Sequence, residues 1–412
     1  DRRPDWVGVT ATTPEFHLAV RILGAIRHGA PKVKVMIGGP HATVQPASCV
    51  KAGFDRVVCD DGLTGVLIAV EDGAPQVVIG PKVDPADWPL PARDLINLWS
   101  YRYDLHGRGV RSSNLMGSMG CPYGCLFCGG RELSYFRKLR VRPPRDIIYE
   151  ADHLKSEYRI DGLMFFDDEV NIHDAWLLEL CTRLASRRTA WRAFVKANIF
   201  HDRQARMMAA AGCVEVCSGV ESGSDRILRE SIRKHTTYEI NRSFVTTARK
   251  YGIASKAFCM VGNPGETIED IKLTKQWLLD ARPDGFDLTI FSPYPGSPIY
   301  DHHYPGGART DRRHEVMGGL ANDISFPNID FAREGIAYKT VPGEYRAVVN
   351  TSSLTSEDLV RLRDEIDAEV RRELGLPEIK RAVSGATEYV TDGADRANAT
   401  SAFDHSMGQS GP

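Results

Sequence analysis

Three cysteines lie close together in the run from Gly120 to Gly130. Cys121, Cys125 and Cys128 have the spacing C-x3-C-x2-C, and no fourth cysteine is near them. Cysteine thiolates hold iron–sulfur clusters, and a four-iron cluster normally takes four of them. Three ligands leave one iron with an open position, as three protein ligands do at a catalytic zinc. The spacing therefore predicts a 4Fe-4S cluster that can bind a further molecule.

A zinc knuckle is the strongest alternative for this cysteine group. It needs a fourth nitrogen or sulfur ligand, which usually comes from a second pair of cysteines or histidines at short spacing. The nearest histidines are His106 and His153, and neither belongs to such a pair. Chance clustering of three cysteines in a buried loop is less favoured, because cysteine is among the least common residues of the chain. An iron–sulfur cluster with an open site is the favoured interpretation.

The overall composition is that of an ordinary globular protein. The chain has 412 residues, of which 42% are hydrophobic and 26% charged, so it is long enough for two or three domains. The formal net charge of −2 gives no reason to expect a nucleic-acid partner. No apolar run has the length of a membrane span, and no signal peptide is at the start. Nine cysteines without the spacing of a disulfide scaffold favour a reducing cytoplasm, and the first residue, Asp1, predicts a fragment or a processed product.

Strand and helix patterns alternate along most of the chain. The first part predicts strands at 6–10, 33–37 and 55–59, with helices at 14–28 and 46–52. A second part predicts six strands, each followed by a helical pattern, at 113–117, 163–166, 191–195, 214–218, 257–261 and 286–291. These patterns predict a doubly wound parallel sheet and then an open (β/α)6, TIM-like barrel, with ligands bound at the carboxyl ends of the strands.

Changes in composition predict the domain limits. Residues 1–80 form the first α/β domain, and the proline-rich stretch within 81–110 forms a linker. Residues 111–300 form the barrel, and residues 301–379 form a C-terminal extension with an amphipathic helix. The tail, 380–412, has few large apolar residues and is predicted to be disordered.

The cysteine run, with Phe127 directly before its last cysteine, resembles that of the radical S-adenosylmethionine (SAM) superfamily. The resemblance implies a 4Fe-4S cluster on Cys121, Cys125 and Cys128, whose open iron is chelated by the amino and carboxylate groups of SAM. It also implies that an external electron donor, such as flavodoxin or ferredoxin, drives cleavage of SAM to a 5′-deoxyadenosyl radical. Phe127 would lie against the adenine, and packing in the loop is an equal alternative for this residue.

Two acidic loops at strand ends resemble SAM-binding segments of the same superfamily. Asp167, Asp168 and Glu169 follow an apolar strand, where the superfamily has the acceptors for the methionine ammonium. Glu221, which lies between glycines, resembles the residue that contacts the ribose or the methionine carboxylate. Taken alone, the first loop also fits a solvated helix cap and the second a surface turn.

The Gly-Asn-Pro-Gly-Glu-Thr run after the strand at 257–261 also resembles a motif of the superfamily. The resemblance implies an adenine-facing backbone at Val261 and Gly262. Helix initiation explains Thr267 equally well, because Thr267 and Asp270 form a capping-box pattern. Lys196 and Asn198, after the third barrel strand, have a weaker claim as polar residues of the same site.

The segment before the cysteine loop resembles the Rossmann-like cobalamin-binding domain of the cobalamin-dependent radical SAM enzymes. In that family a glycine pair, here Gly38-Gly39, leaves room for the nucleotide tail of the cofactor, and Thr10 and Thr12 would line the same pocket. Two features depart from the family. The first strand and helix of the domain are missing at the amino end, and the turn Cys59-Asp60-Asp61-Gly62 replaces the usual Gly-Glu-Gly-Glu.

The resemblance implies a methyltransferase that uses both cofactors on an unactivated carbon or phosphorus of a small molecule or natural-product intermediate. An oxidative cyclase or rearrangement enzyme with the same cofactors is one alternative, and a corrinoid- or cluster-binding protein without turnover is another. A methylthiotransferase is disfavoured, because its amino domain brings a second cysteine trio and only Cys49 and Cys59 are present here. No catalytic acid or base is predicted, and Tyr123, Arg131 and Tyr294 are candidates for the pocket lining alone.

Overall fold

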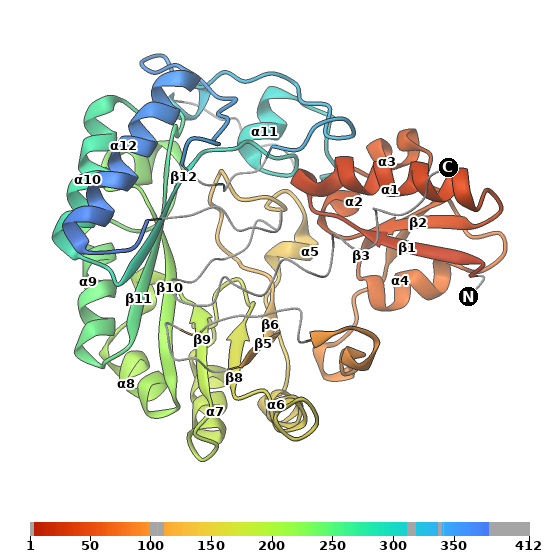
Figure 1. Ribbon diagram of the computed structural model, residues 1–412, viewed down its shortest axis with the longest axis horizontal. Helices are drawn as coiled ribbons and strands as arrows, with labels where there is room; N and C mark the ends of the chain where they lie inside the picture. Colours follow the sequence, from red (N-terminus) through yellow and green to blue (C-terminus); the bar gives the residue numbers. More distant parts are fainter. Residues whose placement is uncertain are drawn as a thin grey trace, which may run out of the picture.

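The computed structural model describes residues 4–98, 105, 111–310, 319–336, 340 and 342–378. Two parallel sheets lie beside each other in it, a small one near the amino end and a large one that follows (Figure 1). The predicted disordered tail lies outside the described residues, as does most of the second half of the predicted linker. No helix within the described ranges has both the length and the apolar character that are needed to cross a membrane.

The small sheet has four parallel strands, paired in chain order at the right of Figure 1. They are β1 (Trp6–Thr10), β2 (Lys34–Gly38), β3 (Arg56–Asp60) and β4 (Val77–Gly80). The connecting helices are α1 (Phe16–Gly29), α2 (Pro40–Val44), α3 (Pro46–Ala52) and α4 (Gly62–Ala69). The three predicted strands are confirmed to within one residue. The sequence does not predict β4, because its apolar run between two prolines is too short to stand out.

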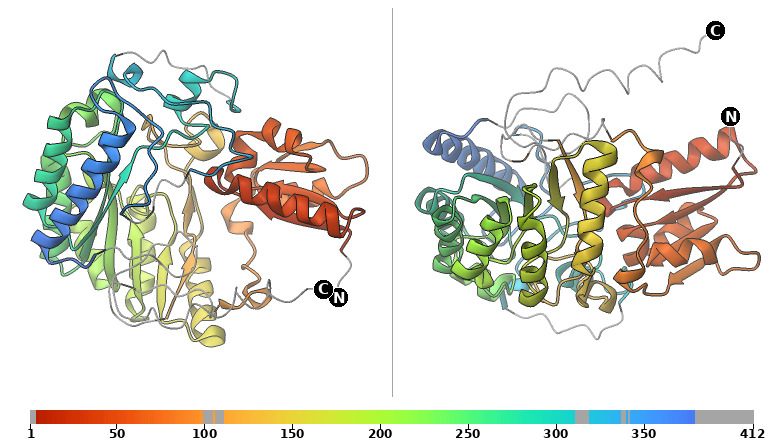
Figure 2. Two further views of the ribbon diagram at one scale, coloured as in Figure 1. Left: turned by 45° about the horizontal axis from the view of Figure 1, so that its top comes forward. Right: turned by 90° about the horizontal axis from the view of Figure 1, so that it is seen from below.

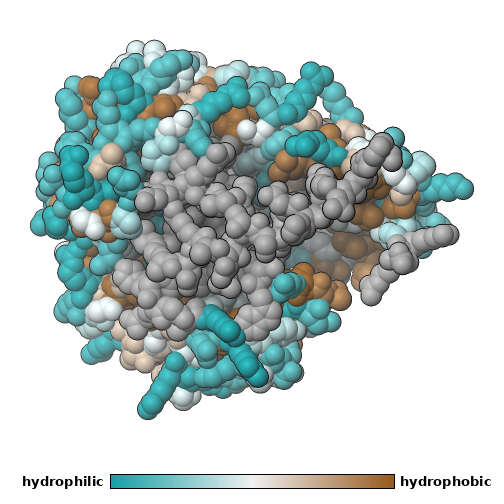
Figure 3. Space-filling model, in the orientation of Figure 1, coloured by the Kyte–Doolittle hydropathy of each residue, from teal (hydrophilic) through white to brown (hydrophobic). Residues whose placement is uncertain are grey.

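Side chains that alternate along the strands bury both faces of this sheet, which confirms the doubly wound arrangement. One set packs in the main core with α1, α2 and α3: Val35, Ile37, Val57 and Cys59. The other set packs with Ala69 of α4: Met36, Val58 and Val78. The outer side of α4 exposes Leu63, Val66 and Leu67, and hydrophobic surface is visible around the small sheet at the right of Figure 3.

A buried histidine lies at the start of α2. His41 is fully buried, its ring is 3.9 Å from that of Phe16 between centroids, and its two nitrogens lie 3.1 Å from Thr13 Oγ1 and 3.0 Å from Ser48 Oγ. Burial lowers the pKa of His41 from 6.5 to about 4, because the charged imidazolium loses its hydration. His41 is therefore neutral in the folded protein at neutral pH.

Because His41 is buried and neutral, we expect the first domain to lose stability in acid. Between pH 6.5 and about 4 the unfolded chain binds a proton at His41 and the folded chain does not, so the free energy of unfolding falls as the pH falls through this window. A shift of this size corresponds to about 3 kcal/mol. Urea unfolding at several pH values should show this loss in the native protein and not in His41→Asn. An equal loss in both would assign the acid sensitivity to other groups.

The large sheet has six parallel strands in the order β12-β11-β10-β9-β8-β5, which confirms the predicted open (β/α)6 barrel. Its strands are β5 (Ser112–Leu115), β8 (Gly162–Phe165), β9 (Ala190–Phe194), β10 (Cys213–Glu221), β11 (Ala254–Val261) and β12 (Gly285–Ile290). Helices cover its outer face in both views of Figure 2: α6 (Pro144–Tyr158), α7 (Asp174–Ala185), α8 (Asp202–Ala210), α9 (Tyr238–Lys250) and α10 (Ile268–Ala281).

The predicted C-terminal helix covers the open edge of this sheet. It is α12 (Ser356–Leu374), and it begins at a capping box formed by Thr355. Two arginines of α12 donate hydrogen bonds to carbonyl oxygens of the edge strand β12, Arg363 to Leu288 at 2.8 Å and Arg371 to Phe286 at 3.0 Å. These bonds occupy acceptors that an edge strand otherwise leaves open.

Candidate functional site

The three predicted cluster cysteines lie on one loop at the carboxyl side of β5. A short antiparallel pair, β6 (Ser118–Met119) and β7 (Arg140–Val141), closes the base of this loop, and α5 (Ser134–Arg137) lies within it. The backbone N–H of Cys121 donates to the carbonyl of Phe136 at 3.0 Å. We call residues 120–139 the cysteine loop.

The cysteines of this loop differ from the others in exposure. Cys121, Cys125 and Cys128 are partly exposed, whereas the other six cysteines are buried in the two cores. Burial raises the pKa of Cys128 to about 11, while the nearby guanidinium of Arg131 favours the thiolate and so opposes this rise. Among the described residues, no three His, Cys, Asp or Glu side chains are gathered as the ligands of a single metal ion would be. A cluster distributes its thiolates over different irons, so three partly exposed thiols on one loop fit it.

The first two carboxylates after β8 hold the start of the cysteine loop. Asp167 is buried and accepts hydrogen bonds from Gly117 N at 2.8 Å and Ser118 Oγ at 2.6 Å. Asp168 accepts one from Gly120 N at 3.0 Å. Burial raises the pKa of Asp167 to about 6, against the effect of these two donors. Both predicted SAM-binding residues are thus engaged with the chain itself.

Glu169, the third carboxylate, differs from the first two because it does not hold the cysteine loop. Its Oε1 lies 4.0 Å from Lys196 Nζ, and its Oε2 is buried without a hydrogen-bond partner among the described residues. The Lys196 ammonium also lies 4.0 Å from the ring centroid of Tyr123 in the cysteine loop. A second buried acceptor without a partner is Asn198 Oδ1. Buried polar atoms are rarely left unpaired, so the free acceptor of Glu169, whose charge acts on Cys121 and Tyr123 of the cysteine loop, fits a ligand that brings hydrogen-bond donors.

Glu221 ends β10 with a left-handed backbone, at φ 67°. Its Oε1 accepts a hydrogen bond from Lys234 Nζ at 2.7 Å, and this ammonium lies 5.9 Å from the ring centroid of Phe127. A Cβ atom on Gly219 would overlap both charged groups, so a larger residue there would displace the ends of this ion pair. A strained residue beside a buried ion pair is typical of a functional site.

Sequence reasoning did not find Lys234. It follows a π-helical stretch, Ile227–Ser231, and no regular periodicity leads to it. π-Helical turns occur often at functional sites, and this is the one signal that could have indicated the region. Together, Lys196 and Lys234 place two cations beside the predicted acidic residues.

The predicted adenine-facing backbone after β11 already has partners within the chain. The N–H of Gly262 donates to the buried carboxylate of Glu266, and the carbonyl of Val261 accepts from Phe291 N at 2.8 Å. A Cβ atom on Gly262 would lie 2.9 Å from Leu359 of α12, so this position is also closed on one side by the C-terminal helix. The adenine contact at these two residues stays a prediction.

The predicted cobalamin residues gather at the carboxyl ends of β1 and β2. Thr10 and Gly38 are opposite each other in the strand register. Gly39 has φ 92°, and a Cβ atom on it would lie 2.5 Å from Thr10 Oγ1. Thr12 is exposed, and its hydroxyl donates to Glu15. The close approach of these two chain segments is therefore enough to explain Gly39, and a larger residue there would disturb the loop before it met any ligand.

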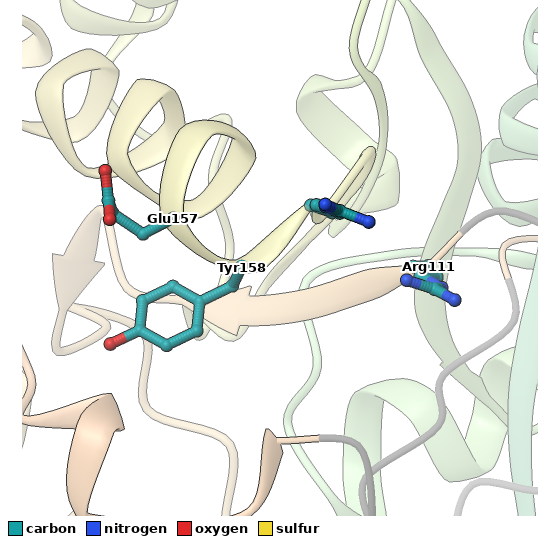
Figure 4. Close-up of a pocket in the computed structure, with 4 residues that line it drawn as sticks. Arg111, Glu157 and Tyr158 are labelled. Carbon is teal, nitrogen blue, oxygen red and sulfur yellow. The ribbon is translucent and has the colours of Figure 1, made fainter.

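A separate hollow lies at the opposite, amino-terminal end of the barrel strands. It has a volume of about 460 Å³ and is lined by Arg111, Glu157, Tyr158 and Arg159 (Figure 4). Arg111 directly precedes β5, and Tyr158 ends α6. Catalytic groups of such barrels lie at the carboxyl ends of the strands, so this hollow is no part of the candidate site.

Two family models match the chain. The model of the Radical SAM superfamily matches residues 116–278, which contain the cysteine loop and most of the barrel. The model of the B12 binding domain matches residues 1–67, which contain β1, β2 and β3. Together they cover more than half of the chain.

Individual relatives agree with these matches. An uncharacterized methyltransferase of Pyrococcus horikoshii is 29% identical over 326 residues, which are 73% of this chain and 69% of that protein. The anaerobic magnesium-protoporphyrin IX monomethyl ester cyclase of Rubrivivax gelatinosus is 25% identical over 329 residues, which are 72% of this chain and 58% of the cyclase.

A solved structure has the same fold. The radical SAM methyltransferase TsrM of Kitasatospora setae, with cobalamin and a 4Fe-4S cluster bound, superimposes with a TM-score of 0.59 at 20% identity, covering 80% of this chain and 71% of that one. This likeness concerns the fold alone. With a B12-binding domain ahead of a radical SAM barrel and three cysteines on the first barrel loop, the chain belongs to the cobalamin-dependent enzymes of the radical SAM superfamily.

Proposed function

We propose that this enzyme transfers a methyl group to an unactivated carbon or phosphorus of a small molecule. One observation carries the proposal: the carboxyl edge of the small sheet contacts the cysteine loop and the segment after β12. Asp61, after β3, pairs at 3.0 Å with Arg140 of β7, which directly follows the cysteine loop. Gly296, after β12, lies against Val44 of α2 and Gly130 of the cysteine loop. Cofactors bound at these two edges would face a common space.

We assign the SAM site to two ion pairs beside the cysteine loop, Glu169–Lys196 and Glu221–Lys234. The methionine ammonium has three donors, and the unpartnered Glu169 Oε2 is a suitable acceptor. The methionine carboxylate needs a cation, and Lys234 and Lys196 supply two. When bound, the cluster supplies the electron that cleaves SAM and cobalamin supplies the methyl group; the protein orients both and excludes water.

The remaining assignments follow from the sequence. We assign residues 1–80 to cobalamin binding, 81–110 to a linker, 111–300 to the radical SAM barrel and 301–379 to the extension. Thr10, Thr12, Gly38 and Gly39 stay the proposed cobalamin residues. The reaction also requires an external reductant, for which flavodoxin or ferredoxin is proposed, and the reducing cytoplasm is its proposed location.

Analysis of the nucleosides tests this proposal against its alternatives. Reconstituted protein with bound cobalamin is incubated with SAM and a reductant. A methyltransferase forms S-adenosylhomocysteine, because SAM loses its methyl group to cobalamin. Where the target is an sp3 carbon, it also forms 5′-deoxyadenosine, because the radical removes a substrate hydrogen. A cyclase or rearrangement enzyme transfers no methyl group, so it would form 5′-deoxyadenosine without S-adenosylhomocysteine. A binding protein without turnover would form neither.

Glu169→Gln should weaken SAM binding and leave the cluster intact. The substitution keeps the size of the side chain and removes the charge that attracts the ammonium. A hydrogen bond to a charged group contributes roughly 1.5–3 kcal/mol, so the dissociation constant should rise about ten- to hundredfold. Calorimetry with SAM measures the change, and the cluster absorption reports the cluster.

Glu179→Gln is the matched control for this variant. Glu179 lies on α7 with half of its side chain exposed, where it pairs with Arg183. The control should bind SAM as the native protein does. If Glu169→Gln and Glu179→Gln bind SAM with equal affinity, Glu169 does not contact SAM and the assignment is wrong.

A further inference from the structure

The end of β3 carries two adjacent aspartates, Asp60 and Asp61, that both pair with distant arginines. Asp60 forms a bidentate pair with Arg309, with both N–O distances 2.8 Å. Asp61 pairs with Arg140 at 3.0 Å, and both side chains are buried. Asp60 has φ 62°, a conformation that glycine adopts more easily. Aspartate is one of the few residues besides glycine that tolerate this conformation, and here its carboxylate meets the Arg309 guanidinium.

The chain around Arg309 also binds the backbone next to the predicted cobalamin edge. The N–H of Arg309 donates to Val44 O at 2.7 Å, and its guanidinium donates to Thr43 O at 3.3 Å. The side chain of Gln45 donates to Gly307 O at 2.6 Å. These acceptors and donors belong to α2 and its end, directly after the Gly38-Gly39 pair. The segment at 307–309 is therefore hydrogen-bonded to the small domain at the edge where we assign cobalamin.

The same chain segment contacts the cysteine loop. Ile299 N, at the start of α11 (Pro298–His303), donates to Leu126 O at 3.2 Å, and the Thr310 hydroxyl donates to Glu132 O at 3.2 Å. Gly296 lies between the two domains, because a Cβ atom on it would lie 2.8 Å from Val44 Cγ1 and 3.2 Å from Gly130 N. We call residues 296–310 the bridging segment. It touches the proposed cobalamin edge and the proposed cluster loop at once.

We propose that the bridging segment sets the distance between cobalamin and the cluster, and that Arg309 and Asp60 are its positioning residues. This inference rests on the proposed function. A shift of about 1 Å between reacting groups can cost roughly a hundredfold in rate, so two cofactors held by different domains need a rigid connection. The Asp60–Arg309 pair is strong because it is bidentate and charge-assisted. When the Asp60–Arg309 pair is lost, the Asp61–Arg140 pair still holds the two domains together. The small domain is then loosened but not released.

Asp60→Asn tests the inference in the full chain loaded with cluster and hydroxocobalamin. Asparagine tolerates the left-handed backbone and keeps the size of the side chain, so the variant removes the charge and one of the two acceptors that Arg309 uses. Two readouts are measured. One is the magnetic coupling between cob(II)alamin and the reduced cluster, by pulsed electron paramagnetic resonance. The other is the ratio of 5′-deoxyadenosine to S-adenosylhomocysteine.

Asp60→Asn should retain both cofactors and show a broader distribution of coupling. S-Adenosylhomocysteine needs SAM close to cobalt, whereas 5′-deoxyadenosine needs the cluster alone, so the ratio should rise about tenfold or more. Arg309→Lys, which keeps the charge and loses the bidentate geometry, should lie between Asp60→Asn and the native protein. Arg333→Lys is the control, because Arg333 and Asp330 form an exposed surface pair.

Three outcomes separate the inference from the function on which it rests. Unchanged coupling and an unchanged ratio in Asp60→Asn overturn the inference and leave the proposed function standing. Loss of cobalamin from Asp60→Asn also overturns it, because Asp60 would then be a binding residue. A native protein that takes up no cobalamin overturns both.

Discussion

Replacing Cys125 with alanine should abolish the iron–sulfur cluster and all reductive cleavage of SAM. Three thiolates are the whole protein ligand set that the cysteine loop offers, so the loss of one leaves two, too few to retain a four-iron cluster. The native protein, reconstituted without oxygen, should hold about four irons, as expected for this cluster type. The variant should lose the broad visible absorption and release no 5′-deoxyadenosine.

Cys181→Ala is the control for this experiment. Cys181 lies on α7 and is buried in the barrel core. Its replacement deletes a buried sulfur and destabilises the protein, but the cysteine loop is untouched, so the iron content should be that of the native protein. A full cluster in Cys125→Ala, or stoichiometric zinc in the native protein, would overturn the assignment of the site.

The fold was predictable because it depends on patterns that are repeated along the chain. Apolar strands followed by helical spacing gave both parallel sheets, and the capping box at Thr355 gave the start of α12. The sequence does not predict the short strand β4 or the π-helical stretch before Lys234. Both segments are too short to show a regular hydrophobic period. Local pattern therefore predicts the elements that position the site.

For the candidate site, the sequence predicts which residue types are available at the strand ends but not how they pair. The sequence indicates that Asp167, Asp168 and Glu169 follow a buried strand, but three adjacent carboxylates cannot be told apart by spacing. The structure separates them: the first two hold the cysteine loop, and of the three only Glu169 keeps a buried oxygen that no described residue contacts by a hydrogen bond. Lys234 reaches Glu221 through the tertiary fold, which the sequence does not encode locally.

Glu150→Ala should destabilise the protein by more than any surface substitution. Glu150 lies on α6 with its side chain 1% exposed, and its two oxygens pair with Arg93 and Arg142, each at 2.6 Å. Breaking a buried ion pair by removing one partner costs about 3–5 kcal/mol, because it leaves a buried charge uncompensated. Here one change leaves two buried guanidiniums. A typical domain is stable by only about 5–15 kcal/mol, so the variant should unfold at a much lower urea concentration.

The position of this triad connects its stability to the site. Arg93 belongs to the proline-rich segment that leads from the small sheet to the barrel, and it also donates to Asn114 O in β5 at 2.9 Å. Arg142 follows the cysteine loop and donates to Met116 O at 2.9 Å. Glu150 therefore fixes the chain on both sides of the cysteine loop. Its loss should loosen the loop before the barrel core melts.

Two probes in one urea titration distinguish local loosening from global unfolding. Cluster absorption follows the cysteine loop, and far-ultraviolet circular dichroism follows the helices and strands. In Glu150→Ala the cluster should be lost at a lower urea concentration than the secondary structure, whereas the two transitions should lie closer together in the native protein. Glu179→Ala removes an exposed partner of Arg183. It should lower the free energy of unfolding by no more than about 1 kcal/mol, so both transitions should stay close to their native urea concentrations. Coincident, native-like transitions in Glu150→Ala would mean that water or rearranged neighbours satisfy both arginines, and the triad would then have no part in holding the loop.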